Sequence, residues 1–112
     1  MELDSAQLTE LMHIRAALTV MAADDGVRYD RRTARRAARA LARLDGVAPQ
    51  GGPKPKTLPD VGELAARLES LWHVLCAKAK PVFDASLRGT TGVFRGAWAV
   101  NLALADLTEV GL

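Results

Sequence analysis

The residues with the clearest chemical potential are the arginines of the segment RRTARRAARALARL, residues 31–44. With the angular step of an α-helix, five of them fall within an arc of about 100°: Arg32, Arg35, Arg36, Arg39 and Arg43. Ala34, Ala37, Ala38 and Leu41 lie on the opposite side. Several of the arginines are like-charge neighbours four residues apart, and the segment holds no acidic residue to offset them. We therefore expect charges from outside this segment to neutralise the arc.

Three sources of negative charge are compatible with this pattern: a nucleic-acid backbone, an acidic partner protein, or the acidic ends of the first helical segment. Arginine suits phosphate because its planar fork donates two parallel hydrogen bonds, and Lys54 and Lys56 on the following loop extend the basic surface. The sequence shows no helix-turn-helix pattern and no aromatic side chains beside the arginines, so we expect no base-specific contacts. The alternative is a solvated charged face, in a chain whose Ala, Arg and Leu content is typical of a GC-rich bacterial or phage genome.

A second candidate anion site is the segment RGTTGVFR, residues 88–95, where glycines and two arginines precede an expected helix. It lacks the Gly-Lys-Ser/Thr of a phosphate-binding loop, and a plain helix break is the simpler interpretation. Gly92 and Gly96 have the spacing of a close helix contact.

Residues that could hold a metal or act as a nucleophile are few. His73 and Cys76 are three apart, but a zinc site needs four ligands and His13 is the other histidine, so no metal is predicted. Cys76 is interpreted as a residue flanking the core, and Asp24-Asp25 as helix-end chemistry. The sequence holds no paired carboxylates, no Ser/His/Asp set and no cofactor fingerprint, so we expect neither enzymatic activity nor a cofactor.

The elements that position these residues are expected to be helices. The chain has 112 residues, of which 20 are Ala and 16 are Leu, and few are aromatic or β-branched. This composition predicts a single all-α domain over residues 1–112, a small bundle of four to five helices.

Caps and apolar spacing place the expected helices along the chain. Asp4 or Ser5 begins the first, which ends at Asp24-Asp25-Gly26; Asp30 begins the second, which ends near Leu44 or Asp45 with Gly46 in a left-handed conformation. These two helices should form an antiparallel hairpin over residues 1–45. Residues 46–59, with four prolines and three glycines, predict a long loop that crosses the end of the bundle, follows a groove, or divides the chain into two halves.

The remainder, residues 60–112, is also expected to be helical. Asp60 begins a third helix with a strong apolar stripe at Val61, Leu64, Leu68, Leu71, Trp72 and Leu75. It should end near Lys80, because Pro81 disfavours helical conformation in the residue before it, and a short helix should follow from Pro81 to Leu87.

The last expected helix, about Val93 to Glu109, is apolar nearly all round. Such a helix lies inside a bundle or in a subunit interface. We expect its Trp98, Asn101 and Leu102 to join subunits, although a core position is the default for Trp98 and a buried Asn101 would need a partner.

Charge and cysteine content restrict the setting and the function. Residues 1–25 carry five acids against Arg15, whereas residues 28–80 carry twelve Lys and Arg against five acids. No secretory signal or membrane span is apparent and one cysteine cannot form an internal disulfide, so we expect a cytoplasmic protein. The leading hypothesis is a non-enzymatic accessory subunit, docked in a larger complex or homo-oligomer, that binds DNA or RNA backbone without sequence specificity. The competing hypothesis is an adaptor, inhibitor or antitoxin-type protein whose arginines meet an acidic partner protein.

Overall fold

The structure, a computed structural model, contains four helices among the residues that it describes, 3–85 and 95–109. They are α1 (Ser5–Ala22), α2 (Arg31–Leu44), α3 (Val61–Ala85) and α4 (Arg95–Thr108). Backbone positions alone are described for residues 78–85. These described ranges contain no strand, which confirms the all-α prediction. The four helices agree with the lower end of the predicted four to five.

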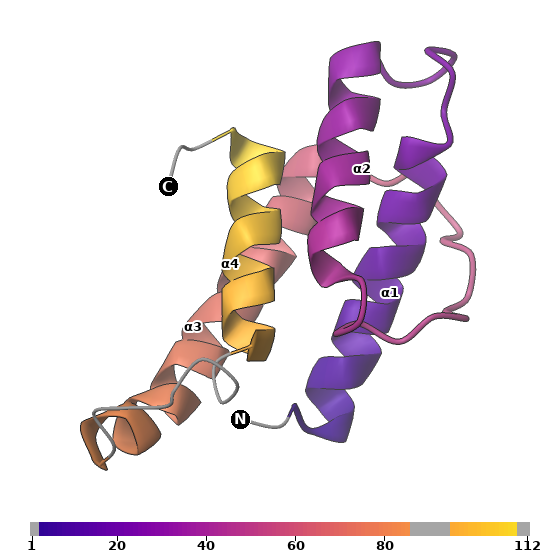
Figure 1. Cartoon of the computed structure of the whole chain (residues 1–112). Helices are drawn as coiled ribbons and strands as arrows, with labels where there is room; N and C mark the ends of the chain where they lie inside the picture. The colour runs from indigo at the N-terminus through magenta and orange to yellow at the C-terminus, as the bar shows by residue number, and fades with distance from the viewer. Residues whose placement is uncertain (1–2, 86–94, 110–112) are drawn as a thin grey trace.

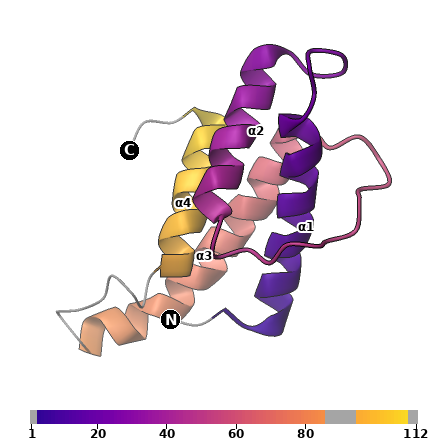
Figure 2. The same ribbon diagram turned by 45° about the vertical axis from the view of Figure 1, so that its right-hand side comes forward.

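The helices form a small bundle in which α2 is central to the visible face (Figure 1). The helices α1 and α2 form the predicted antiparallel hairpin, and α4 lies against the other side of α2, also antiparallel to it. The long helix α3 packs behind α4 and makes a smaller contact with α1 (Figure 2). The end of α2 therefore lies beside the start of α4, although Asp45 and Arg95, at these two ends, are 50 residues apart in the sequence.

Side-chain caps fix where three of the helices begin. The Asp4 carboxylate accepts the Gln7 amide N–H at 2.9 Å, and the Gln7 side chain accepts the Asp4 N–H at 3.0 Å, which completes a capping box. Asp30 caps α2 through the Thr33 N–H at 2.7 Å, and Asp60 accepts the Glu63 N–H at 3.0 Å. All three starts agree with the sequence prediction. The end of α2 also agrees, because Gly46 has a φ of +80° in the left-handed region.

The core lies where the apolar faces of all four helices meet. It comprises Leu11, Ile14, Leu18 and Met21 of α1, Ala37, Ala40 and Leu44 of α2, Leu64, Leu68, Leu71 and Leu75 of α3, and Ala97, Val100, Ala103 and Leu107 of α4. The small alanines of α2 let neighbouring helices approach closely, whereas leucines of α1 and α3 supply most of the buried volume. The four leucines of the stripe predicted for the third helix are therefore core residues, and its Val61 and Trp72 pack against the core.

The loop between α2 and α3 follows α1, one of the three courses that the sequence left open. It must return along the bundle because α2 and α3 run in broadly the same direction (Figure 2). Arg15 of α1 holds its beginning by donating to the Ala48 carbonyl at 3.3 Å. Gly52 packs so closely on α1 that an added Cβ would lie 2.8 Å from the Met12 carbonyl oxygen, and the Tyr29 hydroxyl donates to the Pro59 carbonyl at its end.

The predicted break at Pro81 is wrong, because α3 continues through this residue to Ala85. A proline removes one backbone hydrogen bond and biases the preceding residue, but it does not forbid a helix whose neighbouring turns are already formed. The proposed short helix from Pro81 to Leu87 is therefore the last turns of α3 as far as Ala85, and Leu87 lies outside the described residues. The expected start of the last helix at Val93 also lies outside them.

Candidate interaction surface

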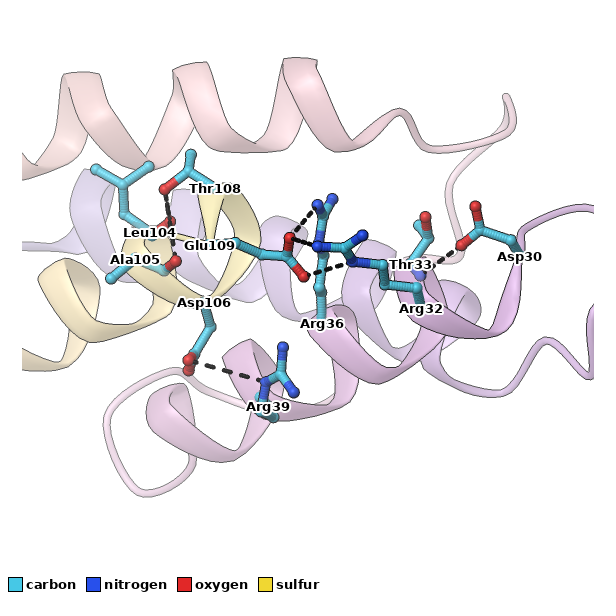
Figure 3. Close-up of polar contacts among 10 residues, drawn as sticks. All are labelled: Asp30, Arg32, Thr33, Arg36, Arg39, Leu104, Ala105, Asp106, Thr108 and Glu109. Carbon is cyan, nitrogen blue, oxygen red and sulfur yellow. Dashed lines mark hydrogen bonds and ion pairs between the residues drawn. The ribbon is translucent and has the colours of Figure 1, made fainter. Parts of the chain in front are cut away.

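Four of the five arginines in the predicted arc form ion pairs with the last helix, as Figure 3 shows for three of them. Glu109, directly after α4, accepts hydrogen bonds from Arg32 Nε at 2.9 Å and pairs with Arg36 Nη2 at 2.8 Å. Asp106 lies 3.1 Å from Arg43 Nε and 4.0 Å from Arg39 Nε. Two carboxylates thus serve four guanidinium groups, which leaves an excess of positive charge at this face.

This arrangement partly neutralises the arginines that have no acidic neighbour within residues 31–44. The neutralising charges do come from outside α2, but from the end of α4 rather than from the ends of the first helix. Glu109 is 77 residues from Arg32, and Asp106 is 63 residues from Arg43. The available signal was the i,i+3 spacing of Asp106 and Glu109, which places two acids on one side of a helix.

The contacts with arginine strongly shift the pKa of Glu109. Hydrogen bonds from Arg36 and then Arg32 hold the pKa of the Glu109 carboxyl far below its ordinary value, since both favour the charged form. The Arg36 side chain is the least exposed of the four, whereas those of Arg32, Arg39 and Arg43 remain about half exposed or more. Arg36 is therefore a structural element, and the outer three retain donors that face solvent.

We name the ion pairs of Asp106 and Glu109 with the four arginines of α2 the ladder. The remaining residues of the predicted basic surface lie apart from this ladder. Arg35 donates to the Arg31 carbonyl at 3.4 Å and faces a hollow that also contains Asp24 and Asp25 of the α1–α2 connection. Lys54 lines hollows beside Thr19 and Val20 of α1, and Lys56 is exposed on the same loop. The structure thus does not bring the two lysines and the five arginines together in one cluster.

Asp24 has the helix-end role that the sequence predicted. Its carboxylate accepts the backbone N–H groups of Gly26, Val27, Arg28 and Tyr29 at 3.0 to 3.3 Å. The bond from Tyr29 is the largest cause of a lowered Asp24 pKa. This carboxylate is committed to shaping the connection between α1 and α2.

The histidine and cysteine positions do not converge. His73 is exposed, with Nε2 3.8 Å from a carboxylate oxygen of Glu69, while His13 lies on α1. Cys76 is partly buried, and this burial raises its thiol pKa above the ordinary value. Within residues 3–85 and 95–109, no group of three or more His, Cys, Asp or Glu side chains could hold a metal ion.

Trp98 lies at the surface, with 57% of the residue exposed, rather than in the core position taken as its default. It borders an open hollow of about 600 Å³ between the end of α2 and the beginning of α4. The hollow is lined by Ala42, Arg43, Asp45, Val47, Arg95, Trp98, Ala99 and Leu102. We name this set the Trp98 hollow. Folding places Arg43 and the Trp98 indole, 55 residues apart in the sequence, in the lining of the same hollow.

The other predicted interface residues are consistent with a surface rather than a core. Asn101 and Leu102 are both partly exposed, so Asn101 is not the buried polar group that the sequence allowed. Gly96 packs against Leu3, and an added Cβ would lie 3.1 Å from that side chain. Leu3 precedes α1, so this is a contact with the N-terminal segment and not the close helix contact that the spacing predicts. Gly92 and residues 88–94 of the second candidate anion site lie outside the described residues.

Comparison with family models, curated proteins and solved structures gives no match for this chain. Among its described helices, none is both long enough and apolar enough to cross a membrane.

Proposed function

We propose that this chain is a non-enzymatic protein-binding subunit or adaptor that docks on its partner through the Trp98 hollow. The observation that carries the proposal is the exposed indole of Trp98 in a mainly apolar hollow between two helices, whose lining also includes one arginine from α2 and one from α4. Tryptophan and arginine are enriched among the residues that dominate binding energy, especially where apolar pockets adjoin them. The ion-paired arginines of α2 support the rigidity of this surface by holding α2 and α4 together.

This proposal takes the competing hypothesis of the sequence analysis as the better supported one. The main reason for expecting a nucleic-acid backbone was an arc of unbalanced arginines, and Asp106 and Glu109 now balance part of it. The same two carboxylates reduce the positive charge that these four arginines would offer to phosphates approaching along α2.

The test is an affinity isolation of the tagged protein from its native cells, with and without nuclease treatment. We expect a partner protein that survives nuclease, is retained by a Val74→Ser variant, and is lost by Trp98→Ser. Val74 is the matched control, because it is a large apolar residue on α3 that is 47% exposed. Equal recovery of the partner by both variants, or no partner at all, would refute the proposal.

Nucleic-acid binding is a second candidate because two carboxylates serve four arginines, and the Arg32 side chain is 69% exposed. Exposed ion pairs are worth little, so phosphates could replace carboxylates around these guanidinium groups. It predicts binding to oligonucleotides that weakens steeply between low and high salt. It also predicts that nuclease releases whatever co-purifies, which is the opposite of the first proposal.

A further inference from the structure

We infer that the partner inserts an acidic amphipathic helix into the Trp98 hollow. This inference rests on the proposed function and specifies the chemistry of the partner. It follows from the shape of the hollow and from the charges at its rim.

The hollow lies between two helices. Trp98 and Leu102 are four residues apart on one side of α4, and the small side chains of Ala42 of α2 and Ala99 of α4 also line the hollow. Helices pack by placing the ridge of one between the ridges of another, and an amphipathic helix in a groove is a recurrent mode of peptide recognition. An aliphatic side chain of the incoming helix would cover these alanines and contact the indole.

The charge of the rim indicates that the helix is acidic. Arg95 is exposed at the start of α4, and within the described ranges it has no ion-pair partner. Arg43, which lines the hollow from α2, shares its carboxylate partner Asp106 with Arg39. The carboxylate in the lining, Asp45, is already bound by Arg15 at 2.9 Å. One arginine of α2 and one of α4 are therefore available to receive carboxylates of a docked helix.

The apolar lining favours this occupant over a nucleic acid. Ala42, Val47, Ala99 and Leu102 supply aliphatic surface that an aliphatic side chain would bury, whereas base stacking would use the indole and leave that surface unmatched. The residues that line the hollow supply the groups that contact with such a helix requires.

The direct experiment replaces Trp98 with the photo-crosslinking residue benzoylphenylalanine in the full chain, in native cells. Irradiation followed by mass spectrometry identifies the segment attached at this position. The inference predicts a protein segment with helical apolar spacing and an excess of Asp and Glu. A basic or uncharged segment, or attachment to nucleic acid, would overturn it.

Charge variants separate this inference from the proposed function. In the isolated complex we expect Arg95→Glu to weaken partner binding by about tenfold or more, and Lys56→Glu, with the same change in net charge at an exposed loop, to have little effect. Replacing an acidic residue of the partner that adjoins the crosslinked position with Lys should restore binding to Arg95→Glu. Loss of the partner in Trp98→Ser together with unchanged binding in Arg95→Glu overturns the acidic helix alone. Retention of the partner in Trp98→Ser overturns the proposed function as well.

Discussion

Nε of Arg43 lies 3.1 Å from a carboxylate oxygen of Asp106, so the acidic end of α4 is held against the basic face of α2. Glu109, directly after α4, forms ion pairs with Arg32 and Arg36 (Figure 3). Arginines at the start of a helix and an acid at the end of one are each disfavoured by the dipole of their own helix. Antiparallel packing brings these opposite charges together, which offsets both unfavourable placements.

The ladder predicts a particular dependence of stability on pH. The Glu109 pKa is lower in the folded chain than its ordinary value of 4.5, so its contribution to the free energy of unfolding is fully present above that value. The contribution is lost as pH falls below 4.5 towards the depressed folded pKa. We expect Glu109→Gln to be less stable than the natural sequence near neutral pH, and the difference to shrink at about pH 3.

Urea unfolding followed by circular dichroism at both pH values measures this difference. Glu69→Gln is the matched control, because Glu69 is an exposed glutamate of α3 beside His73. A Glu109→Gln variant whose stability matches that of the natural sequence at neutral pH would show that the ladder contributes nothing.

Asp24 provides a second prediction about the α1–α2 connection. Asp24→Ala should lower the unfolding midpoint clearly more than Asp25→Ala, because it removes the acceptor for four backbone N–H groups. The two neighbouring acids carry the same charge, so their comparison separates hydrogen bonding from net charge. Equal effects in thermal unfolding would contradict this role of Asp24.

Gly52 tests whether the long loop is packed on α1. A Cβ at this position would lie 2.8 Å from a backbone oxygen of Met12, which cannot move without displacing α1. We expect Gly52→Ala to lower the free energy of unfolding by about 1 to 3 kcal/mol. Gly62→Ala, in the first turn of α3, should cost less than Gly52→Ala, because its added Cβ would meet the side chain of Asp60 at 3.1 Å and no backbone atom, and because helix propensity favours alanine. A neutral Gly52→Ala would mean that the loop is not held at this point.

The sequence predicted the helices and their caps because these depend on local spacing. Leu64, Leu68, Leu71 and Leu75 recur at helical intervals, and Asp30 and Asp60 occupy positions where a carboxylate meets free N–H groups. The sequence did not predict that α3 continues through Pro81. The local bias of proline against a helix does not include the stabilising effect of the helical turns on either side.

The surface itself could not be predicted in the same way. The pairing of Arg32 with Glu109 and the placement of Arg43 and Trp98 around one hollow depend on which helix packs beside α2, and helical periodicity does not determine that neighbour. The interface that the apolar character of the last helix predicts stays a prediction. The position of Trp98 at the edge of a hollow required the packed arrangement.

We expect the thiol of Cys76 to react slowly with alkylating agents, and its replacement to change the stability of the chain little. Because burial raises its thiol pKa above the ordinary 9.0, alkylation by iodoacetamide should be slow at neutral pH and accelerate only above about pH 9. Cys76→Ala should cost at most about 1 kcal/mol, since the small side chain leaves little cavity. Fast alkylation at neutral pH, together with loss of partner binding in Cys76→Ala, would instead identify a functional thiol.

The most direct test of the account is the fluorescence of Trp98, measured in a Trp72→Phe variant so that one indole remains. In the isolated chain we expect red-shifted emission that acrylamide quenches efficiently, because Trp98 is 57% exposed. In the complex with its protein partner, the emission should shift to the blue and become protected from acrylamide, because the docked partner removes the indole from water. Unchanged emission and quenching in the complex would contradict the claim that the Trp98 hollow is the docking surface.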